Sequence, residues 1–362
     1  VGSAAFEADQ RAGFVDMTTA LRSPGSTLKP LIYGLAFDQG LAHPETMIED
    51  RPQSFGTYAP QNFDRQFRGT VRVRDALQLS LNLPVVQLLD AMGPPRLLAA
   101  LDKTAIHAGV PGGQPGLAIG LGGIGISLTD MVQLYAAIAR GGVALPLTWR
   151  MGGTRAEGQR VLSATSAWQV SDILAGLAPP PGAPADRLAY KTGTSYGHRD
   201  TWAIGYDGRH VAGVWLGRAD GTPVPGAFGA DLAAPVLVQT FARIAPRLEP
   251  QPPAPPATLL VSNSQLPRPL QRFRPRETLA ADANAPTVAF PPDGAEVERL
   301  NGAVMVKVTG GRAPFTWLAD GVPVVVQDRA RSTLLTLPGT GFVTLSVIDA
   351  AGRSARASVR LR

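Results

Sequence analysis

A proline-dense stretch divides the chain near residue 245 and limits what either side of it can fold into. Residues 245–276 read APRLEPQPPAPPATLLVSNSQLPRPLQRFRPR. Proline fixes its own backbone angle and lacks an amide hydrogen, so this composition predicts a stiff, extended connector, partly packed around TLLV. We therefore predict a first domain over 1–245, a Pro-rich linker over 246–284 and a second domain over 285–362.

The first domain combines helical and strand patterns. A helix is predicted over 27–39, where apolar residues from Leu28 to Ala36 recur at the spacing of one helix face. Three further segments also look helical: 73–79, 84–92 and 129–140. After Lys191, TWAIGY and HVAGVWLG flank Asp207-Gly208, a dipeptide typical of a tight hairpin. Helices around an antiparallel sheet predict an α+β fold.

The second domain is predicted to be almost entirely strand. Six short apolar segments alternate there with Gly, Pro and Asp turns: AVMVKV, FTWLA, VPVVV, TLLTL, FVTLSVI and ARASVRL. Several short strands in a segment of this length indicate a small β-sandwich of immunoglobulin-like character.

Composition excludes several kinds of chemistry. The chain has no cysteine, which rules out disulfides, thiolate-bound metal and a cysteine nucleophile. The four histidines do not have the spacing of metal ligands: they are His43, His107, His198 and His210. No metal or other cofactor is predicted. The net charge of +6 suits an anionic wall polymer, a membrane surface or nucleic acid. No arginine–aromatic interleaving is present, so a nucleic-acid partner is not predicted.

The first candidate site element is Ser26-Thr27-Leu28-Lys29, placed where a helix is expected to begin after Pro24-Gly25. Residues three apart share a helix face, so the Lys29 amine is expected to reach the Ser26 hydroxyl. A serine needs a nearby base, and a lysine whose pKa is lowered by burial can act as one. Taken alone, this pattern is far more often a serine cap followed by a solvated lysine.

Two further elements follow along the chain. Ser80-Leu81-Asn82 lies at the end of a predicted helix, where serine and asparagine also commonly make local backbone bonds. Lys191-Thr192-Gly193-Thr194 is expected to open a strand, with Gly193 leaving room for a ligand backbone and Lys191 supplying charge for a carboxylate. Each is weak alone. In the order S-x-x-K, S-x-N, K-T-G they match the three-motif signature of serine acylases.

At these residues the chain resembles the penicillin-binding proteins, and within them the bifunctional class A members of the 1C type. In that type a transpeptidase domain of β-lactamase-like fold precedes a small C-terminal β domain. The likeness covers roughly 1–245 and is carried by these segments: RSPGSTLKP (22–30), YAPQNFD (58–64), SLNLPVVQLL (80–89), YKTGTSYGHRDTWAIGY (190–206) and GRADGTPVPG (217–226).

The resemblance implies a role for each motif residue. Ser26 would attack the penultimate D-Ala carbonyl of a peptidoglycan stem peptide, or a β-lactam, and Lys29 would take its proton. Ser80 would relay a proton to the leaving amine, and Asn82 would hold the acyl amide. In the third motif Lys191 would raise the positive potential near the substrate carboxylate. Its remaining members form the rest of the predicted substrate site: Thr192, Gly193 and Thr194.

The same resemblance implies a periplasmic location, with a parent protein anchored upstream in the bacterial inner membrane. Class A members begin with a glycosyltransferase domain, which this chain lacks, so the chain is not expected to polymerise glycan. A cell-wall protein is left open as partner of the second domain.

Two other readings are left open. A β-lactamase shares the three motifs but needs a glutamate in an E-x-x-L-N loop, and Glu157 is the only glutamate between Asn82 and Lys191. A catalytically weak binding or scaffold module of cell-wall synthesis is the other. His198, close after the third motif, either borders the cleft or lies in a surface turn.

Overall fold

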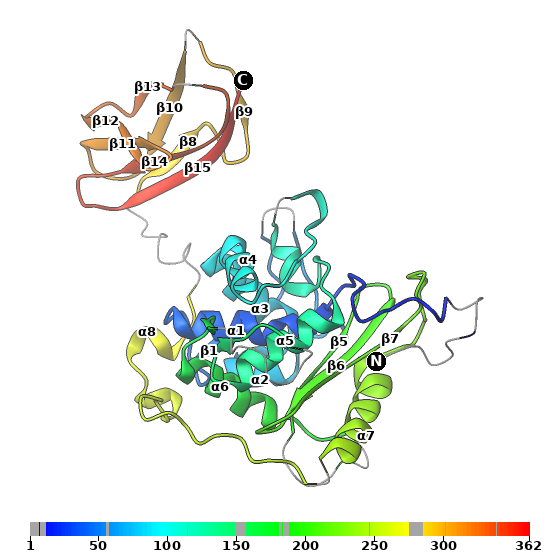
Figure 1. The fold of residues 1–362 in the computed structure, drawn as a ribbon. Helices are drawn as coiled ribbons and strands as arrows, with labels where there is room; N and C mark the ends of the chain where they lie inside the picture. The colour runs from blue at the N-terminus through cyan, green and yellow to red at the C-terminus, as the bar shows by residue number, and fades with distance from the viewer. Residues whose placement is uncertain are drawn as a thin grey trace. The chain divides into compact units, whose positions relative to one another are not determined.

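The computed structural model of the chain forms two compact units, Val1–Phe273 and Arg274–Arg362 (Figure 1). The residues that it describes are 7, 12–55, 58–113, 115–148, 157–180, 183, 188–245, 247–274, 285–300, 302–337 and 339–362. The predicted α+β class of the first unit is confirmed, since its helices surround an antiparallel sheet.

The sheet of the first unit has three antiparallel strands in the order β5-β6-β7. They are β5 (Ala189–Thr194), β6 (Asp200–Tyr206) and β7 (Val211–Gly217). The predicted hairpin is confirmed, because Asp207 Oδ1 accepts hydrogen bonds from the Arg209 and His210 amides and closes the turn. Every residue of β6 is buried, as expected of a central strand covered on both faces.

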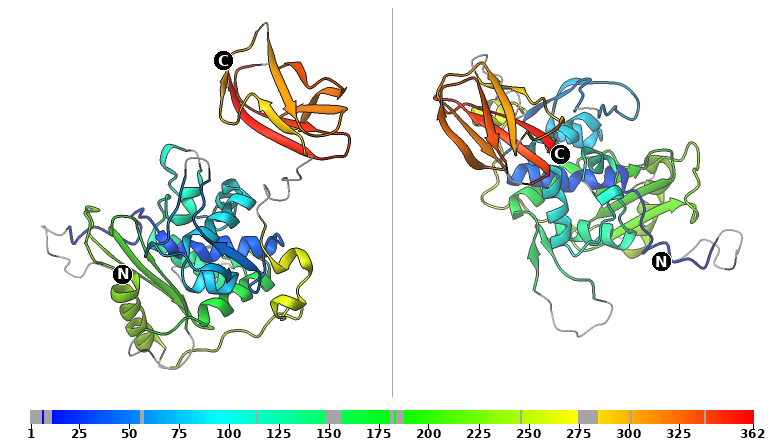
Figure 2. Two further views of the ribbon diagram at one scale, coloured as in Figure 1. Left: turned by 180° about the vertical axis from the view of Figure 1, so that it is seen from behind. Right: turned by 90° about the horizontal axis from the view of Figure 1, so that it is seen from above.

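Helices cover the two faces of this sheet (Figures 1 and 2). Trp202, Ile204 and Tyr206 of β6 belong to a core that includes α5, whereas Ala203 packs with α7. The three predicted helices are confirmed as α2, α3 and α5, and the predicted 27–39 helix is a one-turn 3₁₀ helix followed by α1. The helices of the unit are η2 (Gly25–Leu28), α1 (Lys29–Asp38), α2 (Val73–Gln78), α3 (Asn82–Met92), α4 (Pro94–Lys103), η3 (Pro111–Gly113), η4 (Leu117–Leu121), α5 (Leu128–Ala139), α6 (Ala164–Ala175), η5 (Gly229–Ala233, a π-helix), α7 (Ala234–Ile244), η6 (Asn263–Gln265) and α8 (Arg268–Gln271).

Two short strand pairs complete the first unit. β1 (Met47–Asp50) pairs antiparallel with β2 (Gly69–Arg72), and β3 (Val143–Ala144) pairs with β4 (Gln159–Arg160). In β1 burial alternates along the strand, so that Ile48 and Asp50 face the interior while Glu49 is partly exposed.

The 247–273 segment packs with the first unit, which differs from the predicted linker over 246–284. Leu266 and Phe273 are buried, and these two side chains anchor it. The Phe273 amide donates to Met47 O (2.8 Å), and Thr46 Oγ1 donates to Leu270 O (2.6 Å). As predicted from its prolines, the segment is largely irregular. Its two anchoring side chains follow no helical or strand period, so the sequence did not predict that the segment packs here. Residues 275–284 of the predicted linker lie outside the described residues.

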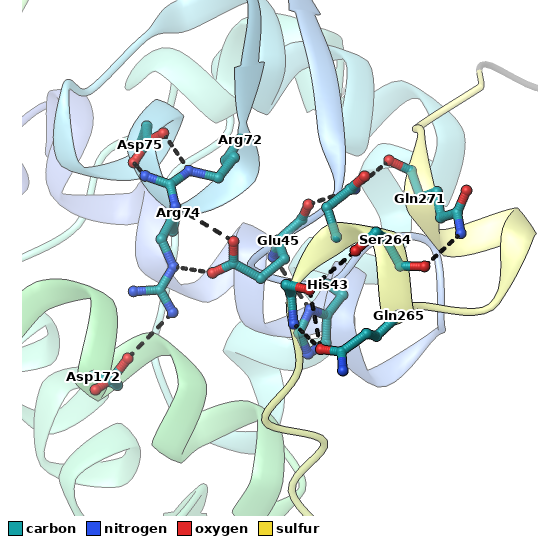
Figure 3. Close-up of polar contacts among 11 residues, drawn as sticks. His43, Glu45, Arg72, Arg74, Asp75, Asp172, Ser264, Gln265 and Gln271 are labelled. Atoms are coloured by element: carbon teal, nitrogen blue, oxygen red, sulfur yellow. Dashed lines mark hydrogen bonds and ion pairs between the residues drawn. The ribbon is translucent and has the colours of Figure 1, made fainter.

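The polar side of this attachment is built around Glu45 (Figure 3). Its carboxylate pairs with Arg74 (2.6 Å) and more weakly with Arg72 (3.5 Å), while its backbone oxygen accepts from the Asn263 side chain (2.8 Å). His43 Nε2 meets Leu259 O at 3.0 Å. Leu259, in the TLLV stretch, is itself 42% exposed, so the segment is fixed there by its backbone oxygen more than by apolar packing.

The second unit is a two-sheet β-sandwich, as predicted, and all six predicted strands are present. One sheet has the order β13-β10-β8 and the other β12-β11-β14-β15-β9. Alternate residues of both sheets, such as Val306, Trp317 and Leu345, share one apolar core. The strands are β8 (Thr287–Phe290), β9 (Glu296–Val297), β10 (Ala303–Thr309), β11 (Phe315–Ala319), β12 (Val322–Asp328), β13 (Ser332–Thr336), β14 (Gly341–Ile348) and β15 (Ser354–Leu361). Within the described part of the chain, no helix has the length and apolar character needed to cross a membrane.

Candidate active site

Ser26 lies in η2, a single 3₁₀ turn that leads directly into α1. The turn is closed by Pro24 O, which accepts from both the amide and the hydroxyl of Thr27 (3.1 and 2.7 Å). Ser26 itself stays partly exposed, while Gly25 and Thr27 on either side are buried. The backbone that carries the Ser26 side chain is therefore held in a well-packed turn, and the residue itself reaches the surface.

Two glycines bring this turn against the end of β5. Gly25 has a φ of +51°, and a Cβ added there would lie 2.5 Å from Thr194 O. A Cβ on Gly193 would lie 2.7 Å from Pro24 O. Real Cβ atoms do not approach this closely, so Gly193 is required by the Ser26 turn. The prediction that Gly193 leaves room for a ligand backbone is thus not what its surroundings indicate.

Lys29 extends from the first residue of α1 to the second motif. Its side chain is fully buried, and Nζ donates to Ser80 O (2.5 Å), Asn82 Oδ1 (2.7 Å) and Leu81 O (3.0 Å), with Ser80 Oγ at 3.4 Å. The direct contact with Ser26 that the sequence predicted is not among the hydrogen bonds of the described residues. In the structure Lys29 Nζ is instead surrounded by acceptors of the second motif.

The second motif is held by an unusual helix end. The Leu81 amide donates to Ala76 O and the Ser80 amide to Leu77 O, the paired bonds of a Schellman motif that closes α2. Ser80 occupies the left-handed position of this motif, with a φ of +58°, where glycine is usual. A serine there costs about 1 kcal/mol relative to an unstrained backbone. This strain directs two carbonyl groups at Lys29 and indicates that the hydroxyl is kept for a function.

Asn82 begins α3, and every polar group of it that the structure describes is engaged. Oδ1 accepts from Lys29, Nδ2 donates to Gln61 O (2.6 Å), and the backbone amide donates to Asn62 Oδ1 (2.7 Å). Its amide orientation is therefore fixed, with one Nδ2 hydrogen left over for a ligand. The structure thus brings Lys29, Ser80 and Asn82 together.

The third motif forms the last four residues of β5 and does not open the strand as predicted. Pairing with β6 begins earlier, at Ala189↔Tyr206, and continues to Thr194↔Thr201. Lys191 is buried, and its Nζ donates to Thr192 O (2.9 Å). Thr194 Oγ1 accepts from the Gly229 amide (3.1 Å), so its own hydroxyl hydrogen remains available to a ligand.

The two lysines of the site are electrostatically coupled. Burial lowers the pKa of Lys29 well below its ordinary value, the positive charge of Lys191 lowers it further, and Asp50 opposes both effects. Burial also lowers the pKa of Lys191 to about 7. A lowered pKa makes the neutral amine of Lys29 more accessible, and a neutral amine is the condition for a lysine to act as a base.

An aromatic cluster that the sequence analysis missed links the two sides of the site. His198 lies with its ring 5.8 Å from Phe63 and 5.1 Å from Phe228, both in edge-to-face geometry. Phe63 follows Asn62 on the side of the second motif, and Phe228 precedes Gly229 on the side of the third. Only His198 had been considered, and Phe63 carried a signal only through YAPQNFD. No set of three or more acidic or histidine side chains in the described ranges is placed to hold a metal ion.

Family models and known proteins are similar to this chain in both units. Residues 4–218 match the family model of the penicillin binding protein transpeptidase domain, and residues 275–361 match the penicillin-binding protein C-terminus family. Penicillin-binding protein 1C of Escherichia coli (strain K12) is 46% identical over 244 residues, which are 66% of this chain and 32% of that protein. Penicillin-binding protein 1B of Vibrio cholerae is 32% identical over 60% of this chain and 31% of that protein.

Solved structures agree on the fold. The PonA1 protein from Mycobacterium tuberculosis in complex with penicillin V superposes with a TM-score of 0.59, at 21% identity, over 68% of this chain and 75% of that one. The chain spans about a third of the length of the curated relatives it matches. Both matched models follow the order expected of the 1C type, a transpeptidase domain and then a small β domain. The chain belongs to the penicillin-binding protein transpeptidase family.

Proposed function

We propose that the first unit is a serine acyl-transferase that acts on D-Ala-D-Ala stem peptides in peptidoglycan crosslinking and is acylated by penicillins at Ser26. The observation that carries this proposal is the convergence on one buried amine. Lys29 Nζ lies within 3.4 Å of both side chains of the second motif, one turn of helix after Ser26. The turn of Ser26 in turn packs on the strand of the third motif.

In acylation, neutral Lys29 takes the proton of Ser26 as Oγ attacks the penultimate D-Ala carbonyl carbon. The carbonyl oxygen becomes an oxyanion, which accepts hydrogen bonds from the backbone amides of Ser26 and Thr194. The close approach of Gly25 to Thr194 O supports this pairing of amides. Attack requires the unprotonated amine, and the lowered pKa of Lys29 supplies it.

Collapse of the tetrahedral intermediate breaks the C–N bond and releases the terminal D-Ala. The departing nitrogen needs a proton, which passes from Lys29 through the Ser80 hydroxyl, 3.4 Å from Nζ. The ester on Ser26 is then attacked by an acceptor amine, and Ser26 regains its proton. Lys191 and the free hydroxyl hydrogen of Thr194 bind the substrate carboxylate in the ground state and the transition state alike.

A β-lactamase reaction is less well supported by the same site. Hydrolysis of the acyl-enzyme needs a base that activates water, and Glu157 is the only glutamate between the second and third motifs. It is exposed beside β4, in a segment away from the three motifs. A persistent ester on Ser26 is therefore expected with penicillins. We also propose a periplasmic site of action, with the second unit left as a candidate binding module for a cell-wall partner.

The proposal is tested by labelling with a fluorescent penicillin. The full chain should form a stable adduct that mass spectrometry places on Ser26, and Ser26→Ala should form none while melting at nearly the same temperature. Turnover of the penicillin would favour the lactamase, and absence of any adduct would favour a binding or scaffold module. An adduct on a different serine would contradict the assignment of the nucleophile.

A further inference from the structure

A chain of hydrogen bonds runs from Lys29 away from the substrate side and ends at a buried carboxylate. Asn82, whose side chain accepts from Lys29, donates through its backbone amide to Asn62 Oδ1 (2.7 Å). Asn62 Nδ2 then donates to both Asp50 oxygens, each at 2.9 Å, and to Gln66 O (2.8 Å). Asn62 is only 4% exposed, so both its hydrogens and its oxygen are committed to this path.

Burial of the Asp50 carboxylate at this position is unfavourable in free energy. It is fully buried on β1, and its only other hydrogen-bond donor in the described structure is the Arg68 amide (2.8 Å). No ion pair within the described part of the chain reaches it, and the Arg68 guanidinium pairs with Asp64 at the surface instead. Burying a carboxylate without a paired cation is unfavourable, and the hydrogen bonds from Asn62 and the Arg68 amide offset part of that cost.

Two side chains whose pKa is raised by the charge of Asp50 lie on one face of α1. Lys29 and Tyr33 are one helical turn apart, and the charge of Asp50 raises the pKa of each, in opposition to burial at Lys29 and in addition to burial at Tyr33. The other charged groups in range are Arg68 on the loop before β2, which interacts with Asp50, and Lys191 on β5, which interacts with Lys29. Asp50 and Lys191 therefore act on Lys29 with opposite signs.

We propose that Asp50, acting through Asn62, is a positioning residue for acyl transfer: it fixes Asn82 against Lys29 and places a negative charge behind the base. Asp50 touches neither substrate nor Ser26. Its two effects are separable, since Asn62 transmits the orientation through hydrogen bonds whereas the charge acts through space. The proposal deepens the proposed function and rests on it.

The charge effect has a definite sign. Removing the negative charge at Asp50 leaves Lys29 with burial and Lys191, both of which lower its pKa. In Asp50→Asn the amine should thus become neutral at lower pH, and the acidic limb of the acylation rate should move to lower pH. A residue with a merely structural role would reduce the rate at all pH values and leave this midpoint in place.

The experiment measures second-order acylation by a fluorescent penicillin between pH 5 and 9 in the full chain. Asp50→Asn should move the acidic limb downward, and Asp50→Glu should restore its position. Glu49→Gln is the matched control, because it removes the same charge from the next residue of β1, on the face that points away from Asn62. That variant should keep the wild-type profile.

Asn62→Ala tests the positioning effect through the plateau rate, which should fall about tenfold to a hundredfold because the hydrogen bond that orients Asn82 is lost. The variant also removes the Asn62 donor of Asp50 and leaves the Arg68 amide, so the charge effect is judged from Asp50→Asn. An unmoved or upward-shifted midpoint in folded Asp50→Asn overturns the charge effect. If that variant does not fold, Asn62→Ala decides, and a wild-type rate there overturns the proposal. An unlabelled wild type would instead refute the proposed function.

Discussion

The two units of the chain use buried polar side chains in different ways. In the second unit the buried polar side chain found in the described ranges is Asp349, which accepts from the amides of Arg312, Ala351 and Arg353 and pairs with the Arg353 guanidinium. Donors and acceptor lie mostly in one tight turn. The carboxylate is satisfied where it stands, and its role is to close that turn.

The first unit also has a locally satisfied carboxylate, Asp207, but at the three motifs it buries charges that are not satisfied locally. The partners of Lys29 lie 51 to 53 residues away, and the lysine has no carboxylate within hydrogen-bonding distance in the described structure. Among the described residues, the hydrogen-bond acceptor of Lys191 Nζ is the carbonyl of its neighbour Thr192. The difference teaches that burial alone does not mark a site. A buried charge whose balance comes from distant groups does, because that arrangement shifts a pKa in a useful direction.

The largest expected effect tests this distinction directly. Lys29→Ala should slow penicillin acylation by about 10²- to 10⁴-fold, because the alcohol loses its base. Lys29→Arg should be nearly as slow, since a guanidinium does not release its proton at working pH. Lys307→Ala, an exposed lysine of β10 in the second unit, is the control and should acylate normally. Rates of Lys29→Ala within tenfold of wild type would show that another group is the base.

A second test compares strained positions in the two units. Ser80→Gly should raise the free energy of unfolding by about 1 kcal/mol, because glycine relieves the left-handed conformation, yet acylation should fall about a hundredfold. Ser80→Ala should lose the same activity without gaining stability. Gln327 of β12 is also left-handed, at a φ of +57°. Gln327→Gly should be stabilising with no change in acylation. Full activity in Ser80→Gly would remove the proton-relay role.

The sequence predicted those parts of the molecule that depend on local pattern. The strands of the sandwich were predicted from short apolar segments separated by Gly, Pro and Asp turns, and in β10 buried and exposed residues do alternate. The three motifs were recognised from their order, but their geometry was not. Lys29 was expected to contact Ser26, three residues away, and bonds instead with groups brought close by tertiary folding.

Other features of the fold and of the candidate site could not be predicted from the sequence, for physical reasons. The 247–273 segment lacks periodicity, so the anchoring of Leu266 and Phe273 was invisible in the sequence. Gly193 was assigned to ligand approach because the neighbour that requires it, Pro24 O, lies far away in the chain. The role of Asp50 was missed likewise, since a single carboxylate in a short strand has no pattern until its partner Asn62 is known.

A third prediction concerns the second buried lysine. Lys191→Ala should lose about tenfold to a hundredfold in acylation efficiency on a free-acid penicillin, and clearly less on its methyl ester, because a charge-assisted bond to the carboxylate is removed. Loss of that positive charge also raises the pKa of Lys29. The acidic limb of the profile should accordingly move to higher pH, opposite to Asp50→Asn. Equal losses on acid and ester would contradict the carboxylate-binding role.

The smallest expected effect comes from removing the second unit altogether. A chain that ends at Phe273 keeps every motif residue and both anchors of the 247–273 segment, so its penicillin acylation rate should equal that of the full chain. A chain that ends at Ala245 is the informative partner, because it exposes the surface that Leu266 and Phe273 cover and loses about 1.5–3 kcal/mol for each side chain. It should melt at lower temperature and lose labelling on mild heating. The two truncations, compared by thermal melting and labelling, separate a segment that belongs to the catalytic unit from a domain that does not. A folded chain ending at Phe273 that resists labelling would show instead that the sandwich takes part in acylation, and the contrast between the two units would fail.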